Sequence, residues 1–491
     1  MTISIPFDNT YAKLPEVFHR RTPPTPVDAP KLIALNRSLA AELGLDPDAL
    51  SGVEGAQAFA GNARLAGSDP IATAYAGHQF GQFVPQLGDG RAILLGEVVD
   101  AGGIRRDIQL KGAGPTPFSR RGDGRAALGP VLREYLISEA MAALGVPTTR
   151  ALAAATTGEQ VYRETALPGA VLTRVASSHI RVGTFQYFAA RRDIPALTAL
   201  VDHVLARHYP EAASRPDRAL ALLEGAVARQ AALVAQWMHL GFVHGVMNTD
   251  NCSIAGETID YGPCAFIDAY DPKAVFSSID RHGRYALANQ PAITHWNLTR
   301  LAECLLPLLS DDENTAIAQA SEALDGFAPQ FEAAYFRGYR LKLGLITERE
   351  DDPALIQGLL DQMAAGRADY TLTFRRLGAF AEHVPEAGVR ELFDDPSLFD
   401  NWGGRYLARL AQEPEGAADR RDRMDRVNPA IIPRNIHVEA MISAAVENDD
   451  FAPFEAFAAA LSKPYDRQAE ATIYAAPPPR ATEPYRTFCG T

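Results

Sequence analysis

The segment HGVMNTDNCSIAGETIDYG, residues 244–262, contains two oxygen-bearing side chains that could share a divalent cation. Asn251 offers an amide oxygen and Asp260 a carboxylate, hard ligands that suit Mg²⁺ or Mn²⁺ when nucleotide phosphates complete the coordination shell. Asp250 could orient or deprotonate an attacking hydroxyl group. Taken alone, these residue types favour a polar surface turn. The position of the segment after a strongly apolar helical stretch and His244 favours a metal site instead.

A β-hairpin would bring the two ligands together. Gly256-Glu257 could form a two-residue type II′ turn, in a register that pairs Ser253 with Asp260. Asn251 lies two residues before Ser253 and would then share the face of Asp260. Diagonal neighbours of this kind lie roughly 7–8 Å apart at their α-carbons. We therefore expect both side chains to reach one cation.

The same segment is similar to the catalytic segment of protein kinases, H-R-D-x-x-x-x-N followed by D-F-G. His244 and Asn251 fall in the first and last places of the first motif, and 260–262 stands for D-F-G. Val246 occupies the place of the catalytic aspartate. Asp250 is the only acid between His244 and Asn251, so it is the best candidate for the missing base.

Two upstream residues fit the same pattern. Lys111 ends the alternating strand IQLK, and Glu134 lies in the first turns of a helix that follows Pro130. Protein kinases hold ATP phosphates with such a strand lysine paired to a helix glutamate. An isolated pair would more often be unrelated surface residues. The order glycine loop, lysine, glutamate, catalytic loop and D-x-G is far more specific.

Glycine-rich loops and arginines accompany this pattern. The stretches 88–91 (GDGR) and 112–124 could cradle phosphates through backbone N–H groups. Arg174 and Arg181 lie among apolar neighbours, where an arginine usually has a carboxylate or phosphate partner. For these two arginines a structural salt bridge is about as good an interpretation as a ligand contact.

The elements that must position these residues change character along the chain. Residues 1–75 read as a wrapping N-terminal extension with one short helix-like piece at 32–44. Residues 76–165 form a β-rich lobe, in which two strands flanking the turn DAGG suggest a hairpin. Residues 166–470 form a mostly helical lobe that contains the catalytic segment 244–262. Residues 471–491 are a Pro-rich tail, and the whole predicts a bilobal α+β fold.

Composition limits the function further. The chain has 491 residues and a net charge of −13, which disfavours a general nucleic-acid role. Its four cysteines, Cys252, Cys264, Cys304 and Cys489, are too few for a secreted disulfide framework. No basic stretch followed by an apolar core suggests a secretory signal, and no apolar run approaches the ~18–20 residues of a membrane span. We expect a cytoplasmic monomer.

Longer motifs resemble the selenoprotein O family, pseudokinase-like enzymes that adenylylate proteins. They include YAGHQFGQF at 75–83, LKGAGPTPFSRRGDGRA at 110–126 and HGVMNTDN at 244–251. The resemblance implies a protein-kinase-like bilobal fold with family-specific N- and C-terminal extensions. It also implies that ATP binds inverted relative to a kinase. AMP then passes to a Ser, Thr or Tyr hydroxyl group of a protein substrate.

The resemblance also assigns roles to residues. It makes Lys111 a phosphate contact held by Glu134, makes Asn251 and Asp260 the ligands of Mg²⁺ or Mn²⁺, and makes Asp250 the proton acceptor. The remaining nucleotide contacts that it implies are Gly88, Gly90, Arg91, Asp123, Gly124, Arg174 and Arg181. The last two would form the extra phosphate pocket that an inverted ATP requires.

The C-terminal tail departs from the family pattern. Some family members carry selenocysteine near the C-terminus, where this chain has Cys489. Some bacterial members are thought to tie this tail to a cysteine just after the D-x-G segment, but residues 274–280 contain none. Cys264 and Cys304 are alternative partners, and neither is compelling.

Two other functions stay open on the sequence. The first is transfer of the γ-phosphate to a protein or small molecule, with Asp250 as a displaced kinase base. The second is a catalytically silent nucleotide-binding pseudokinase. The presence of both metal ligands argues against the second, because a scaffold has little need for the pair.

Overall fold

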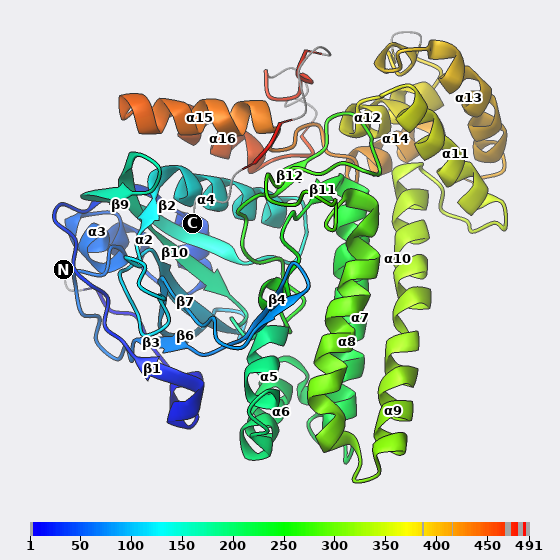
Figure 1. The fold of residues 1–491 in the computed structure, drawn as a ribbon. Helices are drawn as coiled ribbons and strands as arrows, with labels where there is room; N and C mark the ends of the chain where they lie inside the picture. Colours follow the sequence, from blue (N-terminus) through cyan, green and yellow to red (C-terminus); the bar gives the residue numbers. More distant parts are fainter. Residues whose placement is uncertain (1–2, 385–386, 415, 467–472, 480–484, 488–491) are drawn as a thin grey trace.

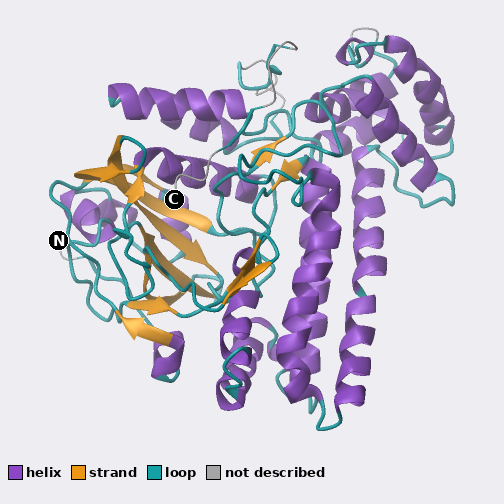
Figure 2. Cartoon of the chain, viewed as in Figure 1, coloured by secondary structure: helices purple, strands orange, loops and turns teal. Residues whose placement is uncertain are grey.

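The computed structural model describes residues 3–384, 387–414, 416–466, 473–479 and 485–487. A sheet-rich N-terminal region stands beside a larger helical region (Figure 1, Figure 2). This arrangement confirms the predicted α+β class and is consistent with a kinase-like fold. In the described part of the chain, no helix is both long and apolar enough to cross a membrane.

The main sheet is antiparallel and has the order β1-β3-β6-β7-β10-β9-β2, with β8 paired to β10. β6 and β7 form the predicted hairpin, and β7 lies between β6 and β10 in the middle of the sheet. The strands are β1 His19–Arg21, β2 Lys31–Leu35, β3 Ile71–Thr73, β6 Ala92–Val99, β7 Arg105–Lys111, β8 Ala126–Ala127, β9 Arg150–Tyr162 and β10 Ala166–Ala176.

The first 75 residues take part in this sheet. β1 and β2 form its two outer strands, and α1 Arg37–Glu42, α2 Pro47–Leu50 and α3 Val53–Phe59 follow β2. The helix-like piece at 32–44 is therefore only partly helical. Its first residues extend along β9, and Asn36 starts the helix by accepting a hydrogen bond from Leu39 N at 3.0 Å. The prediction missed the N-cap, which separates the strand from the helix.

One helix lies between the main sheet and the C-terminal helices. α4 Leu128–Ala143 packs against β9 and β10, and α15 Asn435–Asn448 and α16 Ala452–Leu461 cover its other side (Figure 1). A shared apolar cluster that includes Leu132, Leu136, Val438 and Phe457 joins these layers. The C-terminal helices thus fix the helix that carries Glu134.

Long helices form the second region. α7 Arg218–Leu240, α8 Gln290–Leu309 and α10 Phe327–Lys342 lie side by side (Figure 1). α7 ends at Gly241, whose left-handed φ of 66° suits glycine and turns the chain toward His244. The other helices are α5 Val182–Ala189, α6 Ile194–His208, α9 Glu313–Asp325, α11 Asp352–Ala365, α12 Tyr370–Ala381, α13 Pro396–Leu410 and α14 Ala417–Asp425.

A small ladder brackets the catalytic segment. β11 Phe242–Val243 pairs with β12 Ala265–Phe266, and both strands are buried. The two ends of the catalytic segment therefore lie next to each other in the core. A separate hairpin, β4 Gly77–Gln79 and β5 Gln82–Val84, packs on the turn at Thr249–Asn251.

The described cysteines Cys252, Cys264 and Cys304 are free and buried. Burial raises the pKa of each thiol to about 12, so each is protonated and unreactive near neutral pH. Cys489 lies outside the described residues, so the question whether it forms a disulfide stays open.

Candidate active site

His244 organises the catalytic segment from inside. Its Nε2–H donates to the carbonyl oxygen of Ile259 at 2.9 Å, and its Nδ1 accepts from the N–H of Val246 at 3.3 Å. Burial lowers the pKa of His244, so the ring is neutral and keeps both bonds. His244 therefore links the two halves of the segment, the one before Asn251 and the one ending at Asp260.

The predicted hairpin between these halves is wrong. In the described chain, Ser253 makes an isolated bridge to Arg181, and Thr258 makes one to Thr148. Asn251 ends a short 3₁₀ turn rather than a strand. The backbone of 252–258 instead bonds to segments that lead into and out of the sheet, such as Thr258 N to Pro147 O at 2.9 Å. Local turn chemistry could not reveal these distant partners.

Asp260 lies at the centre of a cluster of cations. Its Oδ1 accepts from Lys111 Nζ and from Arg174 Nη2, each at 2.6 Å, and its Oδ2 lies 3.9 Å from Arg181 Nη1. Burial would raise the pKa of Asp260, but these three charges outweigh it and hold the pKa well below its usual value. Its φ of 67° is left-handed, a conformation that aspartate adopts more readily than most residues.

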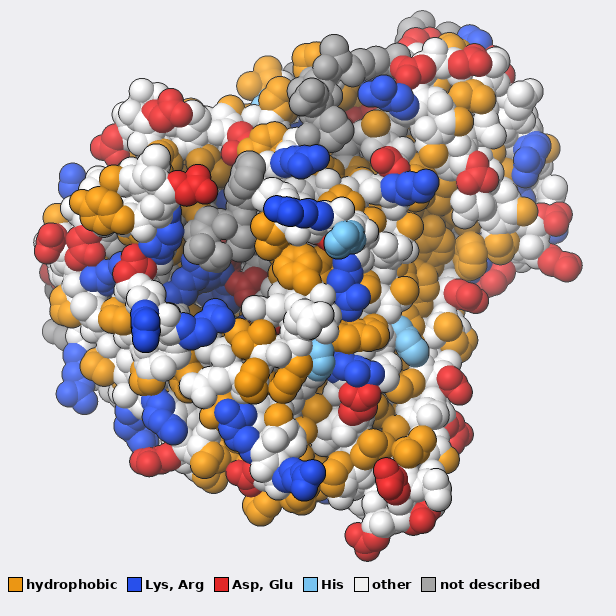
Figure 3. All heavy atoms as spheres, in the orientation of Figure 1, with side chains coloured by type: hydrophobic (Ala, Val, Ile, Leu, Met, Phe, Trp, Pro, Cys, Tyr) orange, Lys and Arg blue, Asp and Glu red, His pale blue; other side chains and the backbone are white. Residues whose placement is uncertain are grey.

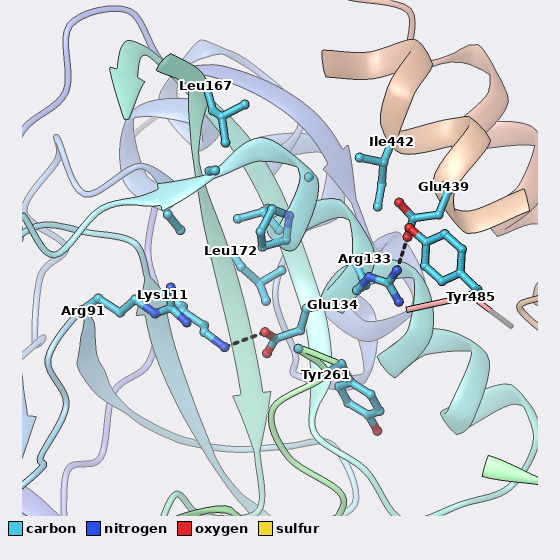
Figure 4. A pocket seen from close by; sticks show the side chains of 16 residues that line it. Arg91, Lys111, Arg133, Glu134, Leu167, Leu172, Tyr261, Glu439, Ile442 and Tyr485 are labelled. Carbon is cyan, nitrogen blue, oxygen red and sulfur yellow. Dashed lines mark hydrogen bonds and ion pairs between the residues drawn. The ribbon is translucent and has the colours of Figure 1, made fainter. Parts of the chain in front are cut away.

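Glu134 forms the second anion of the cluster. Its Oε2 accepts from Lys111 Nζ at 2.7 Å, and its Oε1 accepts from Arg174 Nε at 2.9 Å. Figure 4 shows Lys111 on its strand extending toward Glu134 on α4. The structure thus brings the predicted lysine and glutamate together. It also answers the question left open for Arg174, which makes ion pairs with both carboxylates.

Arg181 supports the turn that carries Asp250. It is buried, its Nη1 donates to the backbone oxygen of Asp250 at 3.0 Å, and its guanidinium lies 4.5 Å from the centre of the Tyr75 ring. The Arg181 side chain thus reaches Asp250 and approaches Asp260 from the start of α5.

Asp250 is a buried carboxylate with few partners. Its Oδ1 makes no hydrogen bond within the described chain, and its Oδ2 accepts only from the Gln79 amide, at 3.4 Å. Burial raises the pKa of Asp250 to about 6, although the charge of Arg181 opposes the shift. A Cβ at position 77 would stand 2.6 Å from Asp250 Oδ1, so Gly77 is required for this arrangement.

Asn251 is held with one oxygen available. Its Nδ2 donates to the carbonyl oxygen of Val246 at 3.1 Å, which fixes the amide, and its Oδ1 makes no hydrogen bond to the residues that the structure describes. Together with the Asp260 carboxylate, it supplies oxygen donors of the kind that Mg²⁺ prefers. The residues present therefore fit a hard divalent cation.

These groups face a single cavity of about 800 Å³. Every site residue predicted from the sequence lines this cavity except Glu134, which lines an adjoining cavity of about 220 Å³ (Figure 4). The predicted residues on the larger cavity are Gly88, Gly90, Arg91, Lys111, Asp123, Gly124, Arg174, Arg181, Asp250, Asn251 and Asp260.

The two glycine-rich loops form one wall. Gly88 and Gly124 have left-handed φ values of 69° and 65°, and a Cβ at Gly124 would lie 2.0 Å from the Gly114 oxygen. Neither position accepts a larger residue, because a Cβ at Gly88 would meet the Phe118 ring of the other loop and one at Gly124 would meet the backbone of Gly114 in its own loop. Asp123 pairs with Arg163 at 2.8 Å, so part of its role is to hold this wall.

Sequence reasoning missed the hairpin β4–β5 as part of the site. Tyr75, Gln79 and Phe80 line the cavity, and Gln79 contacts Asp250. The motif YAGHQFGQF was noted, but no role was assigned to any of its residues. Only the fold shows that this hairpin packs on the Asp250 turn.

Because the Asp250 carboxylate is buried, we expect that replacing it by a neutral amide stabilises the folded protein, by an amount that depends on pH. Because its pKa is about 6 in the folded protein and 3.8 ordinarily, ionising Asp250 disfavours the folded state. This cost is absent below the lower pKa and complete above the higher one. We expect Asp250→Asn to raise the free energy of unfolding by up to about 3 kcal/mol near pH 8, with most of the gain gone near pH 4.

Denaturant unfolding of both proteins across this pH range, without nucleotide or metal, measures the difference. An equal effect of the substitution at both ends of the range would contradict the burial of an ionised Asp250.

Comparisons with known proteins find similar chains of one family. A family model described as "Protein adenylyltransferase SelO" matches residues 1–462. The chain is similar to a "Protein nucleotidyltransferase YdiU" of Bradyrhizobium sp. (strain ORS 278), with 64% identity over 491 residues and 100% of both chains covered. It is 65% identical over 498 residues to a protein of that name from Methylorubrum extorquens, again with 100% of both chains covered.

Proposed function

The chain belongs to the SelO family of protein adenylyltransferases, and we propose that this nucleotidyltransferase moves AMP from ATP to Ser, Thr or Tyr hydroxyl groups of proteins. The observation that carries the proposal is a buried carboxylate, Asp250, whose Oδ1 has no hydrogen-bond partner among the described residues and which lines a cavity that also holds several cations. The kinase base position holds Val246, so a proton acceptor must come from elsewhere.

ATP would bind inverted relative to a kinase. The family resemblance implies this orientation, and the two buried arginines that line the cavity, Arg174 on β10 and Arg181 just after it, support it. Buried guanidinium groups suit phosphate oxygens and not an adenine ring in that place. The inner end of the cavity would then hold the terminal phosphates, and the glycine-rich loops near Asp123 would line the outer end.

Mg²⁺ or Mn²⁺ would be held by Asn251 Oδ1 and the Asp260 carboxylate. When bound, the ion would neutralise phosphate charge and so favour attack by an oxygen nucleophile. Lys111 would contact phosphate and is positioned by Glu134, which fixes its ammonium group at 2.7 Å.

The reaction follows from these placements. The acceptor hydroxyl oxygen forms a bond to the α-phosphorus while the bond from that phosphorus to the bridging oxygen of the β-phosphate breaks. Diphosphate leaves with the bond electrons. The hydroxyl proton passes to Asp250, whose pKa of about 6 makes it ionised at neutral pH and still basic enough to accept.

ATP labelled at either the α- or the γ-phosphate tests the proposal. We expect only the α-label to reach protein, with diphosphate released and an AMP adduct visible by mass spectrometry of the chain or an added protein. Transfer of the γ-label would instead support a kinase with Asp250 as displaced base. No transfer of either label would support a silent nucleotide-binding protein.

A further inference from the structure

A group of arginine and aromatic side chains lies next to Gln79 and Phe80, the two residues of the β4–β5 hairpin that line the cavity near Asp250. Trp296 is at its centre: the guanidinium carbons of Arg284 and Arg300 lie 4.8 and 5.0 Å from the ring, and the His78 ring lies 5.2 Å away. Phe83 packs on His78 at 4.9 Å and is 41% exposed. We name these five residues, from the β4–β5 hairpin, α8 and the loop before α8, the arginine–aromatic surface.

The positive charge of this surface is poorly balanced. Between residues 272 and 303 the chain has four Lys or Arg residues and two acids, Asp280 and Glu303. Both oxygens of Asp280 accept backbone N–H groups, those of Arg284 at 2.9 Å and Tyr285 at 2.8 Å, and the side chain is buried. Its carboxylate is therefore committed to the loop and offers little to a cation outside it.

Of the two arginines, only Arg300 has an acidic partner among the described residues. Within the described chain Arg284 makes no ion pair and its Nε has no hydrogen-bond partner, while Arg300 pairs only with Glu303, at 2.7 Å. Burial lowers the pKa of His78, a hydrogen bond with Gln186 opposes this shift, and the charges of Arg300 and Arg284 lower the pKa further. Figure 3 shows Lys, Arg and His side chains gathered across the middle of this face, although the net charge of the chain is −13.

The surface continues into the active site through the hairpin. His78 N donates to Thr249 Oγ1 at 2.7 Å, and Phe80 N donates to Asn248 Oδ1 at 3.0 Å. Gln79, between them, reaches Asp250 and lines the cavity with Phe80. A chain lying on this surface would therefore end beside the carboxylate that we propose as the proton acceptor.

We propose that the arginine–aromatic surface binds acidic residues next to the acceptor hydroxyl group of the protein substrate. This inference rests on the proposed function and adds a substrate class, segments rich in Asp or Glu. Stacked guanidinium groups keep their outward N–H donors for carboxylates, and the exposed Phe83 offers apolar contact to the same segment. The triphosphate would contact other cations, Lys111, Arg174 and Arg181, which line the cavity itself.

A pair of peptides tests the inference. Both contain one Ser, and they differ only by Glu or Gln at the flanking positions, so charge changes without size. For the wild-type chain we expect kcat/KM for AMP transfer to favour the Glu peptide about tenfold at low ionic strength, with the preference falling as salt is added. Arg284→Gln and Arg300→Gln should each reduce the preference, and the double variant should remove it.

The control is Arg390→Gln, because Arg390 is an exposed arginine paired with Asp400 at 2.7 Å and does not belong to the arginine–aromatic surface. It should keep the full preference. Equal transfer to both peptides by the wild type, or a preference that survives in the double variant, would overturn the inference and leave the proposed function intact. Transfer to neither peptide, with no AMP on any protein, would overturn the proposed function and this inference together.

If the double variant does not fold, the salt dependence of the wild-type preference for the Glu peptide tests the inference instead. A single-stranded oligonucleotide provides a further test. If it removes the preference for the Glu peptide without competing with ATP, the surface is a nucleic-acid site and the proposal is overturned.

Discussion

Asp260→Asn is expected to remove AMP transfer almost completely, by about 10³-fold or more. The substitution keeps the size of the side chain and deletes the anion that holds Lys111 Nζ and Arg174 Nη2, each at 2.6 Å. It also deletes the carboxylate that we propose as a metal ligand. Single-turnover transfer of the α-label, measured at saturating ATP and metal, gives the size of the loss.

The matched control is Asp369→Asn. Asp369, like Asp260, is a carboxylate paired with a buried arginine, here Arg434 at 2.8 Å, but it does not line the cavity. Its loss should lower the free energy of unfolding and leave transfer near the wild-type rate in the folded protein. If Asp260→Asn kept a rate within about tenfold of the wild type, the metal assignment would be wrong.

Local motifs predicted much of the candidate site. Lys111, Glu134 and Asp260 each follow from a short pattern at a recognisable place, a strand end, a first helical turn and a D-x-G sequence. In the structure the three residues form one cluster, in which Lys111 Nζ lies 2.7 Å from a Glu134 carboxylate oxygen and 2.6 Å from an Asp260 carboxylate oxygen. The β6–β7 hairpin and the long helix before His244 followed from alternation and helical periodicity in the same way.

The errors concern partners far away in the sequence. The hairpin of 251–260 was derived from the turn at Gly256, whose φ of 74° is indeed left-handed. The backbone around that turn nevertheless bonds to Pro147, and Cys252 O accepts from Val182 N at 2.9 Å. A local pattern contains no information about such contacts, so the flanking residues were paired with each other.

The contribution of β4–β5 was hidden for the same reason. His78 contacts Thr249 across 171 positions, and Gln79 contacts Asp250 across the same separation. The sequence could suggest Asp250 as a base because it was the one acid available. It could not show that Gly77 and Gln79 enclose this carboxylate and thereby set its basicity.

Asp250→Asn is expected to reduce kcat by about 10²–10⁴-fold while ATP still binds. The amide keeps the shape of the side chain and cannot accept the hydroxyl proton. The contacts of Lys111, Glu134 and Asp260 do not involve the Asp250 side chain, so the phosphate-binding cluster should remain intact. Nucleotide binding measured by calorimetry, beside single-turnover transfer, separates the two effects.

The pH dependence distinguishes a proton acceptor from a structural carboxylate. Asp250 has a pKa of about 6, and only its ionised form can act as the base. The rate of the wild type should therefore fall about tenfold for each pH unit below 6 and level off above it. The residual rate of Asp250→Asn should lack this acidic limb. If the variant lost activity but kept the limb, Asp250 would position the turn at Thr249–Asn251 and another group would take the proton.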